Sequence, residues 1–175
     1  MRVNFYRSLA AAGALALTMS AVQPAAAQDP QYRNVVSANP FGLLLEVFNA
    51  EYERVITESS TVGLGGSFIS RDSVGYANAD VFWRYYPGPN PLEGWAFGAK
   101  VGLTKIEDSG PYFGYGFDVN HSWLMGKNNN FYVGVGFGLK RLVGVPDDVD
   151  DEDFVSDDVW NYVPTFRIIN IGFAF

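Results

Sequence analysis

The sequence predicts an all-β fold, an eight-stranded antiparallel transmembrane β-barrel. Three observations predict it. Apolar residues alternate with glycine or charged residues over several segments of about ten residues, which is the pattern of strands with one lipid-facing side. Clusters of Gly, Pro, Asn and Asp separate these segments. The chain is 16% aromatic and holds 19 glycines, yet after residue 27 no apolar run approaches the roughly 20 residues of a membrane helix.

The alternation is clearest in the segment 130–141, NFYVGVGFGLKR. Successive strand side chains point to opposite faces, so Val133, Val135 and Phe137 share one face with other apolar residues. Glycines and Lys140 occupy the other face. The same division recurs in the segments 61–68, 77–85, 95–104 and 113–123. In a small barrel the apolar face meets lipid, and the narrow interior holds small residues and paired polar groups.

Turns mark off seven strands. The turns lie at 56–61, 70–75, 87–94, 107–111 and 126–130, and a long acidic stretch at 146–158 separates the last two strands. The first of the seven strands is 48–56, and the last is the terminal segment. Bacterial barrels normally have an even number of strands, so we expect an eighth between Tyr32 and Val47. Leu43 and Leu45 have the opposite parity from Phe48, which requires a bulge or short loop near residues 46–48.

The last segment, VWNYVPTFRIINIGFAF, changes parity within itself. Ile169, Ile171 and Phe173 share one face, whereas Phe166, Tyr162 and Trp160 lie on the other. A bulge at Ile168–Ile169 would bring both apolar sets onto the outer face and turn Arg167 inward.

The first 27 residues predict a secretory signal peptide. Arg2 and Arg7 precede a short apolar run, and Ala25 and Ala27 form a cleavage site. The barrel domain would then cover residues 28–175. Loss of the leader removes two arginines and no acid, leaving ten basic and nineteen acidic residues. This balance excludes nucleic acid as a partner, and the lack of cysteine excludes disulfides and thiolate metal sites.

Two stretches carry a resemblance to known proteins. The alternate apolar residues that end the chain, Ile169, Ile171, Phe173 and Phe175, resemble the C-terminal signal of bacterial outer-membrane β-barrels, which implies recognition by the barrel-assembly machinery. The segment 39–68, with Tyr52-Glu53-Arg54, resembles the start of a family of small, mostly uncharacterised outer-membrane barrels. The resemblance implies a place among outer-membrane lipid and lipopolysaccharide, with turns such as 126–130 in the periplasm and the acidic stretch outside. It implies no catalytic residues.

The charged residues of inward parity form the candidate site. They are Glu51, Glu53, Asp80, Arg84, Lys100, Asp118, Lys140 and, with the bulge, Arg167, and Asn120 joins them. They could line a polar channel or form a plug of salt bridges like the interior of the outer-membrane protein A barrel. Eight strands leave room only for side chains or one small ligand, and buried charges persist when paired. These two constraints favour the plug.

Other motifs are weaker. His121 is the only histidine and precedes Ser122. Barrel enzymes that deacylate lipid A use a histidine as base and a serine as nucleophile, so the pair raises the alternative of such an enzyme. Adjacent strand residues face opposite ways, so we expect His121 to belong instead to an interfacial aromatic belt. Aromatic residues also lie near the predicted strand ends, as membrane-interface girdles require: Trp83, Tyr85, Trp95, Tyr112, Trp123 and Trp160. The acids of 147–158 lack the spacing of a calcium loop; loose Ca²⁺ or Mg²⁺ bridging to lipopolysaccharide is the alternative to a solvated loop.

Taken together, the sequence predicts a monomeric, non-enzymatic outer-membrane protein with no cofactor and no specific metal site, acting in envelope integrity or surface interaction. Three alternatives stay open: a lipid-modifying enzyme in the barrel wall, a narrow pore, and a soluble periplasmic binder of lipocalin type with its apolar face inward.

Overall fold

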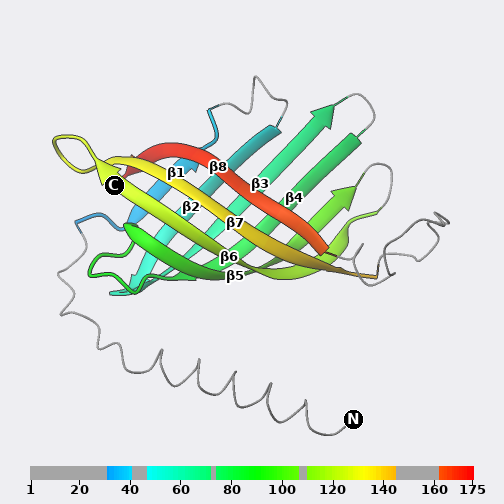
Figure 1. Ribbon diagram of the computed structural model, residues 1–175, viewed down its shortest axis with the longest axis horizontal. Coiled ribbons are helices and arrows are strands. Elements are labelled where there is room, and N and C mark those ends of the chain that lie inside the picture. Colours follow the sequence, from blue (N-terminus) through cyan, green and yellow to red (C-terminus); the bar gives the residue numbers. More distant parts are fainter. Residues whose placement is uncertain (1–30, 41–46, 72–73, 107–109, 145–161) are drawn as a thin grey trace, which may run out of the picture.

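The computed structural model describes residues 31–40, 47–71, 74–106, 110–144 and 162–175. These residues form a closed barrel of eight strands, each antiparallel to its neighbours (Figure 1). The strands are β1 (Asn34–Ala38), β2 (Val47–Thr57), β3 (Ser60–Arg71), β4 (Val74–Tyr85), β5 (Gly94–Ile106), β6 (Tyr112–Met125), β7 (Phe131–Val143) and β8 (Tyr162–Ala174). β8 pairs with β1 to close the sheet. The predicted all-β class and the closed eight-stranded antiparallel barrel are confirmed.

The predicted eighth strand is β1, within the expected stretch between Tyr32 and Val47. β1 pairs with β2 from Asn34 opposite Arg54 to Ala38 opposite Ala50. The change of parity expected before Phe48 involves Leu43 and Leu45, which lie outside the described residues, as do the leader 1–27, Trp160 and the acidic stretch 147–158.

The two ends of the barrel differ. The turn end carries the turn between β2 and β3, the connection 86–93, the turn 126–130 and the C-terminus, which lies at the left of Figure 1. The far end is where β3 meets β4, β5 meets β6 and β7 meets β8. The turn 126–130 therefore lies at the opposite end of the barrel from the last residue of β7 and the first residue of β8.

The barrel is apolar outside and polar inside. Exposed large apolar side chains occur on all eight strands, among them Val36, Phe48, Leu64, Val81, Phe97, Phe117, Phe137 and Phe166. The inner parity carries the buried polar residues. Strand alternation places each class on its own face, so the side assignment made from the sequence is correct for these residues.

Every charged side chain inside the barrel has a glycine directly across from it on a neighbouring strand. Arg84 and Asp118 both lie opposite Gly98, and Lys100 and Lys140 both lie opposite Gly116. The remaining pairs are Glu51 with Gly65, Glu53 with Gly63, Asp80 with Gly65 and Gly102, and Arg167 with Gly136. Because the lumen of an eight-stranded barrel is narrow, these long side chains fit only where the neighbouring residue has none.

The predicted bulge in β8 is present. Gly134 of β7 pairs with Asn170, but Gly136 pairs with Arg167, so β8 has one more residue than β7 over this interval. The extra residue turns both Ile168 and Ile169 to the outer face and buries Arg167 and Asn170 inside. A bulge of this kind is what allows one strand to change the face of its side chains.

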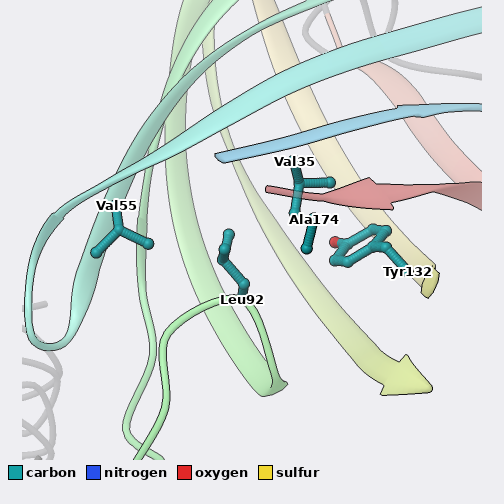
Figure 2. Packing of buried hydrophobic residues seen from close by; sticks show 5 residues of the cluster. All are labelled: Val35, Val55, Leu92, Tyr132 and Ala174. Carbon is teal, nitrogen blue, oxygen red and sulfur yellow. The ribbon is translucent and has the colours of Figure 1, made fainter. Parts of the chain in front are cut away.

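An apolar cluster fills the lumen at the turn end. It consists of Val35, Val55, Leu92, Tyr132 and Ala174, and Tyr32 and Leu124 pack against it. Figure 2 shows Leu92 reaching from the connection 86–93 toward the side chains of the strands. Leu92 is fully buried at a φ of 70°, a left-handed conformation that is rare for such a residue. Its packing therefore offsets a local backbone cost, and the cluster closes this end of the barrel.

β1 is much shorter than its neighbours. It pairs with β8 only from Ile171 to Ala174, so among the described strands the rest of β8 is bonded on the β7 side alone. Pro164 lies in this part of β8, where the missing N–H of proline is tolerated as at a sheet edge. Asn170 reaches across to β2 and donates a hydrogen bond from Nδ2 to Oδ1 of Asn49 at 2.9 Å.

The glycine arrangement predicts a position-specific cost of adding a methyl group. In Gly116→Ala the new Cβ would lie 2.8 Å from the Cα of Lys140 and closer still to the carbonyl oxygen of Leu139. Backbone on the next strand must move, and overpacking of this kind costs about 1–3 kcal/mol. Urea unfolding of the refolded barrel should show a lower midpoint.

Gly66→Ala is the matched control on β3. Apart from its chain neighbours, the one described atom within 4 Å of the new Cβ would be the carbonyl oxygen of Asn78, at 3.4 Å. This is an ordinary contact distance. An equal effect of the two substitutions would contradict the packing explanation.

Candidate functional site

Arg84 lies at the centre of the charged interior. Its Nη1 is 2.8 Å from Oε2 of Glu53 and 3.2 Å from Oε2 of Glu51. Its Nε is 3.5 Å from Oδ1 of Asp118. The guanidinium also lies over the ring of Phe82, with Cζ 3.9 Å from the ring centroid. One cation from β4 thus joins carboxylates of β2 and β6 across the lumen.

Glu53 is a buried carboxylate with three partners. It is 1% exposed, and besides Arg84 it accepts hydrogen bonds from Thr61 Oγ1 at 2.6 Å and from the Tyr86 hydroxyl at 2.7 Å. Tyr86 follows the end of β4. Burial, together with the negative charge of Glu53, raises the pKa of Tyr86 well above its ordinary value. The phenol therefore remains a donor to Glu53.

Arg167 joins the same network from β8. Its Nη2 is 2.9 Å from Oε2 of Glu51 and donates to Ser37 Oγ at 3.3 Å, and its Nη1 donates to the Tyr132 hydroxyl at 2.9 Å. The bulge that turns Arg167 inward is therefore what connects β8 to β1, β2 and β7 through side chains.

A second group lies toward the far end, on β4, β5 and β7. Lys140 is fully buried, forms an ion pair with Asp80, and donates to Thr104 Oγ1 at 2.9 Å. Asn78 donates to the other carboxylate oxygen of Asp80 at 3.0 Å. Charged inner residues are paired here as around Arg84, as the low dielectric of an interior requires.

Lys100 differs from the other three cations. Its ammonium group donates to Thr165 Oγ1, but no carboxylate oxygen of the described residues lies within 4.0 Å of it in an ion pair, unlike Arg84, Lys140 and Arg167. The acids on the two neighbouring strands have other partners: Asp80 pairs with Lys140, and Asp118 pairs with Arg84 and accepts from Asn120 at 2.6 Å.

The far half of the lumen contains a cavity of about 480 Å³. Charged residues of the network line its base, among them Glu51, Arg84, Lys100 and Arg167. Phe166 and Ile168 also line it, although both side chains are exposed on the outer face. The wall of the cavity therefore includes residues of β8 whose side chains are on the outer face.

The structure brings all eight predicted interior residues into the lumen, but as two groups and one separate cation. Glu51, Glu53, Arg84, Asp118 and Arg167 form the first group; Asp80 and Lys140 form the second; Lys100 stands apart from both. The buried interior also contains Phe82, Tyr86 and Leu92, which were not among the residues predicted from the sequence. Phe82 has inward parity and could have been found, whereas the burial of Leu92 depends on the path of the connection 86–93.

His121 and Ser122 face opposite sides of β6. Ser122 is buried and donates from Oγ to the carbonyl oxygen of Leu92 at 2.9 Å. The His121 ring packs between Trp95 and Trp123, with centroid distances of 4.8 Å and 4.4 Å. The two side chains therefore cannot act as a base and nucleophile on one substrate.

The terminal apolar residues lie on the outer face of β8 and just after it. Ile169, Phe173 and Phe175 are exposed and Ile171 is half-buried. The backbone of Phe175 accepts hydrogen bonds from the N–H groups of Arg33 and Asn34, which fastens the end of the chain to β1.

Comparisons with protein-family models, with curated protein sequences and with solved structures found no match to this chain. Within the described ranges, no helix has the length and apolar character needed to cross a membrane. In the same part of the chain, no three His, Asp or Glu side chains are grouped closely enough to hold a metal ion.

The network predicts that loss of Glu53 is costly. Glu53→Ala leaves Arg84 with one fewer partner and removes the acceptor of Thr61 and Tyr86 in the barrel interior. Breaking a buried ion pair from one side costs about 3–5 kcal/mol. The urea midpoint of the refolded barrel should fall accordingly.

Glu58→Ala is the control, since Glu58 is an exposed acid in the turn between β2 and β3. Surface substitutions usually change stability by about 0.5 kcal/mol or less. If the two alanine variants unfolded at the same urea concentration, the ion-pair network would not contribute to the stability of the barrel.

Proposed function

We propose that this chain is an integral β-barrel protein of the bacterial outer membrane. The observation that carries the proposal is the reversed polarity of the barrel. Phe166 and Phe173 are each 62% exposed on the outer face, whereas Lys140 is fully buried inside. A water-soluble barrel hides its apolar face, and a barrel in lipid exposes it.

The strand lengths support a membrane-spanning role. β2 to β8 have between 11 and 14 residues, and a tilted strand needs about 9–11 to cross the hydrocarbon layer. Charged side chains on the described outer face, Arg54, Lys105 and Arg141, are near strand ends. The middle of the outer face therefore offers an uncharged band to lipid.

Aromatic side chains support the same proposal. Trp83, Tyr85, Trp95 and Trp123 are on strand residues near the turn end, and Trp95 and Trp123 enclose His121. Amphipathic rings favour the boundary between hydrocarbon and head groups. We infer that this girdle marks the membrane boundary on the periplasmic side.

Within the outer membrane we propose a non-enzymatic role in envelope integrity or surface interaction. A water-filled pore is disfavoured because the apolar cluster around Leu92 and Tyr132 fills the turn end and ion pairs cross the lumen above it. A lipid-modifying dyad is disfavoured by the opposite directions of His121 and Ser122. A lipocalin-type binder would need the apolar residues inside, where charged ones are found.

The test is the location and behaviour of the full-length protein. Expressed in a Gram-negative host, it should fractionate with the outer membrane, and the folded form should migrate faster than the boiled form on SDS gels because a closed barrel resists SDS before heating. Recovery from the soluble periplasmic fraction, with identical migration before and after boiling, would overturn the proposal.

A further inference from the structure

We propose that the cavity in the far half of the barrel binds a single-chain amphiphile, with its anionic head group, a carboxylate or phosphate, held by Lys100 and its alkyl chain extending along β8. The alkyl-chain part rests on the proposed function, because it takes the outer face of β8 to be in contact with lipid.

Lys100 carries a positive charge that has no ion-pair partner among the described residues. Lys100 is 8% exposed and lines the cavity. Its ammonium group carries three N–H donors, of which the described residues accept one, through Thr165. A buried cation without a carboxylate partner is costly, so an anion that enters the cavity gains a charge-assisted hydrogen bond which Lys100 does not make within the protein.

A neighbouring arginine also holds an unused donor. The Nε atom of Arg167 is buried and has no hydrogen-bond partner among the described residues, whereas the Nε atom of Arg84, although not hydrogen-bonded, lies 3.5 Å from Oδ1 of Asp118 in an ion pair. Both arginines line the same cavity as Lys100. Buried donors are normally satisfied, and the oxygens of a carboxylate or phosphate could accept from several of these groups at once. Asp80, which also lines the cavity, is already paired with Lys140.

Apolar residues in the lining of the cavity fit an alkyl chain. Val163, Pro164, Phe166 and Ile168 of β8 are among the residues that line the cavity. Other residues that line it are polar, such as Asn49, Asn78 and Asn120. A volume of about 480 Å³ lies within the range of small-ligand sites. A ligand with a charged end and an apolar end matches this division, and a wholly polar ion would leave the β8 side unused.

The experiment is native mass spectrometry of the full-length barrel released from neutral dodecyl maltoside micelles. The probes are dodecanoate and dodecyl phosphate, with 1-dodecanol, acetate and inorganic phosphate as partial ligands. One dodecanoate or dodecyl phosphate should remain bound per barrel. Lys100→Met should weaken this binding about tenfold or more, as expected for loss of a hydrogen bond to a charged group.

Lys105→Met is the matched control, because Lys105 lies on the same strand but is exposed on the outer face; it should bind as the natural protein does. Lys100→Arg should retain binding, since it keeps the charge. Ser67→Phe should abolish binding by filling the cavity from β3, where Ser67 lines the wall without an ion pair. Together these variants separate loss of the site from loss of the fold, which the SDS gel shift reports for each.

Several results would overturn the inference. Equal binding of 1-dodecanol would remove the need for an anionic head, and equal binding of acetate or inorganic phosphate would remove the amphiphile in favour of a small anion. Unchanged binding by a folded Lys100→Met barrel would remove Lys100. A barrel that enters the outer membrane but binds no probe overturns this inference alone, whereas a soluble periplasmic barrel that binds them overturns only the membrane proposal.

Discussion

The pairing of Arg84 with carboxylates of β2 and β6 is the interaction on which the rest of the barrel depends. Once a lumen this narrow holds a guanidinium group, unpaired charge would cost more than a small domain can offset. The inner glycines provide space for the long side chains, and the β8 bulge supplies Arg167 as a second partner for Glu51. Local features of several strands therefore serve one network.

The network also divides the molecule into two unlike halves. Toward the turn end, Tyr132 connects the charged groups to an apolar cluster that fills the lumen. Toward the far end the side chains leave a cavity that residues of β8 help to line. A barrel closed at one end and hollow at the other is poorly suited to conduct solutes and well suited to hold a ligand from the far side.

Much of this arrangement follows from alternation in the sequence. Parity alone assigned Glu51, Arg84 and Lys140 to the interior, and the conflict between Phe166 and Ile169 located the bulge that buries Arg167. Parity could not choose partners, because pairing depends on height and rotamer across the lumen. It gave no reason for Lys100 to have no ion-pair partner among the described carboxylates. Parity also did not predict the burial of Leu92, because this burial depends on a turn that brings a loop residue into the barrel.

The central claim is that hydrocarbon contacts the outer row of β7. Because the chain has no cysteine, single cysteines can replace Val133, Val135 and Phe137, with Lys127 in the turn 126–130 as a water-exposed control. With a bimane label on each and the protein in lipid bilayers, spin-labelled acyl chains should quench the three β7 sites and aqueous iodide should quench only position 127. Quenching of the β7 sites by iodide but not by the lipids would contradict the account.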